Sequence, residues 1–240
     1  MRGACESGNL ELVEYAIAKG AKEMSQSLKT AAKYGTKEML MKLIEKGAKM
    51  KEKTDDLVIA SIQEKNLSTF QFFMEKNLHK LSTLENYRNF VFQKIISEKK
   101  NHCFEIFVHF CKICQKFLTH NDYQLFLKDC IDKNFFDAVF YIIKNVEMKF
   151  QKNFDFDKNK ILVFPDHIIS IAAKNGLDLN FRINSSTLTL LSHYIDNPKK
   201  LKFLLSLGLN PNLNNNTMRE RLPKTNLSYA FCFQKEKSIK

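Results

Sequence analysis

The fold is decided by a stretch of sequence that occurs twice. Residues 4–22 read ACESGNLELVEYAIAKGAK, and residues 31–49 read AAKYGTKEMLMKLIEKGAK. The two copies align without gaps at an offset of 27 residues, and both carry glycine at the fifth position and close on Lys-Gly-Ala. An internal repeat of this length is typical of proteins built from stacked structural units.

Each copy has the pattern of two short helices joined by a tight turn. In the second copy an apolar stripe at three- and four-residue spacing runs through Met39, Leu40, Leu43 and Ile44. Gly47 then supplies the left-handed residue that ends a helix. Because neither helix can bury its apolar face alone, we expect neighbouring helix pairs to stack on one another.

The same pattern continues in weaker form along the chain. Successive unit ends are separated by 27, 30, 68, 31 and 32 residues, and the 68 leaves room for one more unit that ends near Phe117. These ends are Gly20, Gly47, Asn77, Asn145, Gly176 and Gly208. The spacing predicts an all-α fold, an α-solenoid of about seven stacked helix-turn-helix units with a C-terminal capping helix at residues 227–233.

The units resemble ankyrin repeats, which have a period of about 33 residues and open on Thr-Pro-Leu-His-x-Ala. The second copy matches at Ala-x-x-x-Gly-x-x-Glu-x-Leu and at Lys-Gly-Ala. Residues 176–180 (GLDLN) and 208–212 (GLNPN) are similar to the Gly-Ala-Asp-x-Asn exit of that family, and residues 226–230 (NLSYA) to its opening. The resemblance covers most of the chain and is weakest from residue 85 to 166.

This resemblance implies a single ankyrin-like repeat domain over residues 1–233, followed by a disordered basic tail at 234–240. It also implies a scaffold or adaptor, not an enzyme, that binds a partner protein through the concave face made by the first helix of each pair. Carried over by unit position, the side chains expected to be exposed on that face are Ser27, Thr30, Lys33, Tyr34, Gln63, Glu64, Lys94, Lys128 and His193.

The net charge of +12 raises an alternative function. A basic helical repeat can bind nucleic acid through contacts between lysines and phosphates, and such binding weakens steeply with salt. The excess comes from 33 lysines and only 5 arginines, however, and arginine is the residue that makes bidentate contacts to bases and phosphates. Protein binding is therefore the preferred interpretation, and nucleic-acid binding is the second.

One region carries residue types that bind metals. A zinc site needs thiolate or imidazole ligands, and Cys111 and Cys114 form a Cys-x-x-Cys pair near histidines. The pair lies one turn apart in an apolar helical stretch, so we interpret both as core thiols and keep zinc as a weaker possibility. The whole group is His102, Cys103, His109, Cys111, Cys114 and His120.

No catalytic or cofactor-binding motif stands out elsewhere. The paired carboxylates at Asp55-Asp56 and at Asp155 and Asp157 are expected to lie in loops as solvated charge. The chain has no run of about 18 apolar residues and no apolar leader behind Met1. We therefore expect no cofactor and no membrane span. We also expect a monomeric intracellular protein that works in the cytoplasm or within a host cell, with reduced cysteines.

Overall fold

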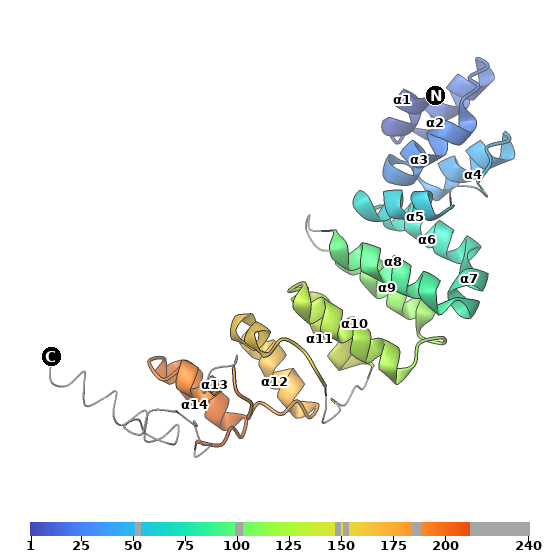
Figure 1. Cartoon of the computed structure of the whole chain (residues 1–240). Coiled ribbons are helices and arrows are strands. Elements are labelled where there is room, and N and C mark those ends of the chain that lie inside the picture. Colours follow the sequence, from blue (N-terminus) through green and yellow to red (C-terminus); the bar gives the residue numbers. More distant parts are fainter. Residues whose placement is uncertain (51–53, 99–102, 147–149, 151–153, 184–188, 212–240) are drawn as a thin grey trace. The chain divides into compact units, whose positions relative to one another are not determined.

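A computed structural model describes residues 1–50, 54–98, 103–146, 150, 154–183 and 189–211 (Figure 1). Over these residues the structure is helical and contains no β-strand, so the all-α prediction is confirmed. A single antiparallel bridge joins Arg182 to Thr189. None of the helices in this part of the chain is long and apolar enough to cross a bilayer.

The chain divides into two compact units, Met1–Phe126 and Leu127–Lys240, with the division inside α10 (His120–Asp132). The predicted capping helix at 227–233 and the tail at 234–240 lie outside the described residues. The helices of unit 1 that precede α10 are α1 (Arg2–Glu6), α2 (Leu10–Ala18), α3 (Met24–Tyr34), α4 (Lys37–Glu45), α5 (Thr54–Gln63), α6 (Leu67–Lys76), α7 (Leu78–Thr83), α8 (Glu85–Ser97) and α9 (Phe104–Cys114).

Helices of unit 1 pack in two rows. Within each pair the first helix contacts the second. The pairs are α1 and α2, α3 and α4, α5 and α6, and α8 and α9. The first helices also contact one another in the order α1, α3, α5, α8, and the second helices do so in the order α2, α4, α6, α9. Figure 1 shows the first and second helices of the leading pairs on opposite sides of this unit. Stacking of helix pairs, which the repeat predicted, is therefore present here.

The second helix of each leading pair begins with a side-chain cap. Asn9 accepts a hydrogen bond from the Leu12 backbone N–H, and Thr36 accepts the equivalent bond three residues on, at distances of 3.2 and 3.3 Å. Asn66 does the same at the start of α6. These caps satisfy backbone donors that a helix start leaves unpaired. The residue at which each of these second helices begins is therefore set by the capping residue next to it in the sequence.

Two polar side chains, one at the N-cap of α6 and one in its first turn, attach the third pair to the second. Asn66 donates from its amide to the carbonyls of Lys33 and Gly35, at 3.1 and 2.8 Å. The buried hydroxyl of Thr69 donates to the carbonyl of Ala32 at 2.6 Å. These carbonyls belong to the last turn of α3 and the residue after it, where the helix has no backbone N–H donors of its own to pair them. The contact therefore satisfies groups that stacking has buried.

Phenylalanine fills the later part of the unit 1 core. The rings of Phe92 (α8) and Phe126 (α10) stack with centroids 3.8 Å apart, and Phe107 and Phe110 of α9 surround Phe92. All four side chains are fully buried. The high phenylalanine content of the sequence is thus explained here by packing between successive helices.

In unit 2 the described helices continue in the same short lengths. They are α11 (Phe136–Asn145), the 3₁₀ helix η1 (Lys158–Val163), α12 (Asp166–Lys174), α13 (Leu190–His193) and α14 (Pro198–Ser206). Pro198 occupies the first position of α14, where its fixed φ suits a helix start, while Pro165 precedes α12 as its N-cap. Gly176 and Gly208 follow α12 and α14 with φ of +91° and +85°.

Candidate functional site

The first helices of unit 1 form a surface pocket of about 340 Å³ between α1 and α3. The seven residues that line it are Arg2, Glu6, Gln26, Lys29, Thr30, Lys33 and Tyr34. We call this site the α1/α3 pocket. Its α3 side chains recur at three- and four-residue spacing, which places them along one face of the helix.

Three residues predicted for the binding face meet beside this pocket. The Lys33 ammonium lies 3.0 Å from a Glu64 carboxylate oxygen, and the Tyr34 hydroxyl donates to the same oxygen over 3.4 Å. Glu64 comes from the turn that follows α5, so the contact spans two neighbouring helix pairs. Tyr34 remains 47% exposed despite this bond. The stacking thus brings together side chains about thirty residues apart in sequence.

The expectation that Ser27 and Thr30 are exposed is wrong. Ser27 is 1% exposed, and its hydroxyl donates to the Glu23 carbonyl at 2.9 Å within its own helix. It also lies against Cys5 of α1, because α1 packs directly on this side of α3. Thr30 is 9% exposed and sits at the floor of the pocket. Small side chains here allow the two helices to approach closely.

The other predicted residues of the binding face are separate from this pocket. Gln63 is exposed at the end of α5. Lys94 of α8 lies over the Phe90 ring at 5.7 Å, which holds its stem against its own helix. In unit 2, Lys128 pairs with Asp155 at 3.6 Å, and His193 is exposed beside Tyr194.

Four residues of the pocket were not among the predicted site residues. They are Arg2 and Glu6, one turn apart on α1 and joined by a 2.9 Å ion pair, and Gln26 and Lys29 on α3. Gln26 and Lys29 lie on the same helical stripe as Thr30 and Lys33. The three- and four-residue spacing of this stripe in the sequence could have identified Gln26 and Lys29 as residues of the same helix face.

The cysteine pair of α9 lies in the core. Cys111 and Cys114 are both buried, and burial raises the pKa of Cys111 far above its ordinary value and that of Cys114 to about 12. A thiol binds zinc as the thiolate, so this surrounding apolar packing opposes metal binding. Among the described residues no three His, Cys, Asp or Glu side chains gather closely enough to hold a metal ion.

The carboxylate pairs have local structural roles. Asp55 and Asp56 lie in the first turn of α5, not in the loop that the sequence suggested. That position suits them because the helix N-terminus carries partial positive charge. Asp157 caps η1 by accepting from the Asn159 backbone N–H at 3.0 Å, and Asp155 lies outside regular structure as expected.

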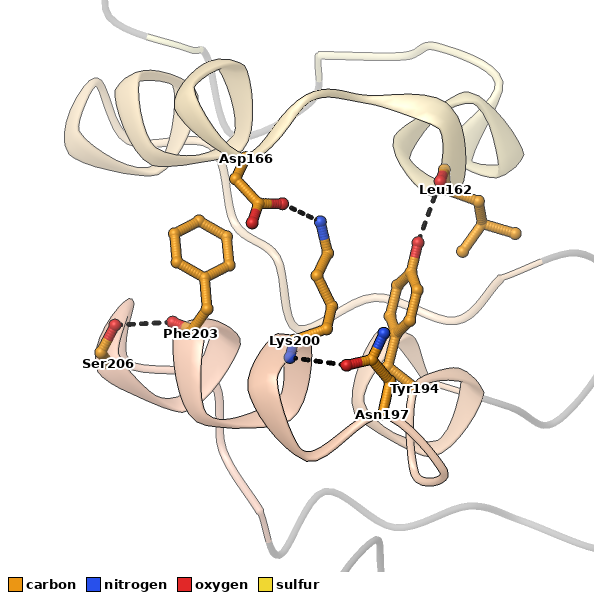
Figure 2. Close-up of polar contacts among 7 residues, drawn as sticks. All are labelled: Leu162, Asp166, Tyr194, Asn197, Lys200, Phe203 and Ser206. Carbon is orange, nitrogen blue, oxygen red and sulfur yellow. Dashed lines mark hydrogen bonds and ion pairs between the residues drawn. The ribbon is translucent and has the colours of Figure 1, made fainter.

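A second polar cluster, in unit 2, surrounds the Lys200 side chain (Figure 2). Its ammonium forms an ion pair with Asp166 and lies 5.3 and 5.4 Å from the ring centroids of Tyr194 and Phe203. The Tyr194 hydroxyl donates to the Leu162 carbonyl at 2.9 Å. Only 12% of the Lys200 side chain is exposed. The cluster therefore attaches α14 to η1 and α12, and its donors are used inside the unit.

No family model matches this sequence, and comparison with curated proteins and with solved structures finds nothing similar to it. The charged and hydrogen-bonding side chains of the α1/α3 pocket surround an open depression next to an exposed tyrosine, which is an arrangement suited to binding.

Proposed function

We propose that this protein is a non-catalytic scaffold that binds a partner protein through the α1/α3 pocket and the adjoining Tyr34–Glu64 contact. The observation that carries the proposal is the pocket itself. It combines an exposed tyrosine with polar side chains that have no partner within the described chain. Tyrosine and arginine are enriched at the centres of protein interfaces because they contribute large contact area together with hydrogen bonds.

We further propose that the whole chain is an ankyrin-like solenoid of seven helix pairs. The described helices group in chain order as α1–α2, α3–α4, α5–α6, α8–α9, α10–α11, η1–α12 and α13–α14, with α7 as a connector. Left-handed glycines at Gly20, Gly47, Gly176 and Gly208 support the grouping, because each follows the second helix of a pair. In such a stack each pair contacts only its neighbours, and a row of first helices offers a continuous binding face.

We also propose that the protein works in a reducing intracellular compartment. Five described cysteines are free and buried, and free buried thiols are typical of proteins that fold where disulfides do not form. They are Cys5, Cys103, Cys111, Cys114 and Cys130.

The proposed function is tested by capture from cell lysate on the immobilised full-length chain, with and without nuclease. We expect a protein to be retained in stoichiometric amount at physiological salt and to survive nuclease treatment. Recovery of nuclease-sensitive material alone, released by raising the salt concentration, would instead establish the basic chain as a nucleic-acid binder.

A further inference from the structure

The α1/α3 pocket contains hydrogen-bond donors that nothing in the described chain uses. Lys29 and Gln26 point from the exposed face of α3 and make neither an ion pair nor a hydrogen bond within that part of the protein. Thr30 is 9% exposed, lines the pocket, and its hydroxyl is likewise unpartnered there. The Thr30 hydroxyl opens on the pocket, so it can form a hydrogen bond to a group that enters there.

The charges around the pocket indicate which kind of group it can bind. Three cationic side chains line it, and two of these already hold a carboxylate: Arg2 pairs with Glu6 at 2.9 Å, and Lys33 with Glu64 at 3.0 Å. Lys29 is the third, and within the described residues it has no counter-ion. A carboxylate placed beside Lys29 could accept from the ammonium, from the Thr30 hydroxyl and from the Gln26 amide.

We propose that the α1/α3 pocket binds a carboxylate side chain from an acidic segment of the partner protein. This inference rests on the proposed function and adds the chemistry of the partner. Lys29 provides the opposing charge, Thr30 and Gln26 donate hydrogen bonds, and the exposed ring of Tyr34 packs along the segment. The partner's carboxylate also competes with Glu64 for Lys33 and for the Tyr34 hydroxyl, whose 3.4 Å bond is long and easily exchanged.

An acidic peptide fits this surface better than a nucleic acid does. A phosphate backbone carries a negative charge on every nucleotide and binds best to an unbroken cationic surface. Here Glu6 and Glu64 lie among the cations, and each would repel a neighbouring phosphate. A peptide can place one carboxylate between them and neutral residues on either side.

The test measures binding of two fluorescent probes to the full-length chain: a short peptide with one glutamate between neutral residues, and a thymidine dinucleotide of the same charge. Lys29→Glu reverses the charge at the pocket, and Lys202→Glu makes the same change on the exposed face of α14. Glu64→Gln releases Lys33 and Tyr34, and Glu105→Gln is its charge-matched control on α9. Circular dichroism of each variant verifies that it is folded.

We expect Lys29→Glu to weaken binding of the single-glutamate peptide about tenfold or more, as loss of a charged interface contact does, and Lys202→Glu to change it less than about twofold. We expect Glu64→Gln to strengthen binding and Glu105→Gln not to. Equal effects of the two lysine variants, no binding of the single-glutamate peptide by the wild type, or tighter pocket-dependent binding of the thymidine dinucleotide would each overturn the inference.

Applying Lys29→Glu in the lysate capture separates the two proposals. If the partner protein is still captured in full by this variant, the carboxylate inference fails while the scaffold function stands. If the wild type captures no protein at all, the proposed function itself fails.

Discussion

Gly47 follows α4 with a φ of +97°, a conformation that residues with a Cβ atom rarely adopt. A Cβ at this position meets no atom within 4 Å, so only the positive φ, and no steric clash with neighbouring atoms, disfavours other residues at position 47. We predict that Gly47→Val lowers the free energy of unfolding by about 1–2 kcal/mol or more, because a β-branched residue is strained in the left-handed region. Urea unfolding followed by circular dichroism measures this change.

Gly3 provides the control for that substitution. It lies within α1 with open space around its Cβ position and no positive φ. Gly3→Ala is expected to leave stability unchanged or to raise it by up to about 1 kcal/mol. Equal stability of Gly47→Val and the wild type would contradict the proposed repeat register.

A second residue-scale prediction concerns pH. His109 of α9 contacts Gln71 through its Nδ1 at 3.3 Å and packs against the Phe70 ring, while its Nε2 is buried without a partner. Burial lowers the pKa of His109 below its ordinary value of 6.5; nearby Glu75 opposes this effect and Lys112 reinforces it. The unfolded chain therefore binds this proton more readily than the folded chain does.

It follows that the His109 contribution to stability is complete above about pH 6.5 and is lost as the pH falls through the lower folded-state pKa. We predict that urea unfolding at about pH 7.5 and about pH 5.5 shows a smaller loss of stability for His109→Gln than for the wild type. An identical pH dependence of the two proteins would show that His109 titrates normally in the folded state.

At the scale of the helices, stacking depends on hydrogen bonds between pairs. Polar side chains of one helix pair donate to the unpaired backbone carbonyls at the end of a helix in the neighbouring pair. Thr69→Val keeps the side-chain shape but removes the hydroxyl that donates to the Ala32 carbonyl of α3. We predict a loss of about 1–3 kcal/mol in unfolding free energy, because the carbonyl is left buried and unpaired. Chemical denaturation of the variant measures this loss.

The matched substitution is Thr83→Val at the exposed end of α7. The hydroxyl of Thr83 donates only to the His79 carbonyl within its own helix, at 2.8 Å. Its removal is expected to change stability by less than about 0.5 kcal/mol. If Thr69→Val costs no more than Thr83→Val does, the contact between the second and third pairs does not depend on this bond.

The element pattern was largely predictable from the sequence. Apolar periodicity and a turn glycine placed a helix around residues 39–44, where α4 occurs, and the predicted unit ends at Gly20, Gly176 and Gly208 follow α2, α12 and α14. Caps such as Asn66 and the buried contacts they make to α3 were not recognised. These contacts join residues more than thirty positions apart, and local periodicity carries no information about such pairs.

At the scale of the whole molecule, the surroundings of the α1/α3 pocket were predicted only in part. Lys33, Tyr34 and Glu64, which the sequence placed on one face, contact one another, and this contact was not predicted. Ser27 and Thr30 were misplaced because α3 buries a broad stripe, and a small polar residue suits either side of it. Lys33 pairs with Glu64 of the next helix pair, whereas Lys29 has no counter-ion among the described residues, and only the folded arrangement establishes this difference.

The central claim is that a partner protein binds at the first helices of unit 1, and two exposed tyrosines test it most directly. Tyr34 borders the α1/α3 pocket and is 47% exposed, whereas Tyr15 lies on the second helix α2 and is 59% exposed. The measurement is capture of the partner from nuclease-treated lysate by wild type, Tyr34→Ala and Tyr15→Ala. Loss of the partner with Tyr34→Ala and its retention with Tyr15→Ala is the predicted result. Retention by both variants, or loss only with Tyr15→Ala, would contradict the account.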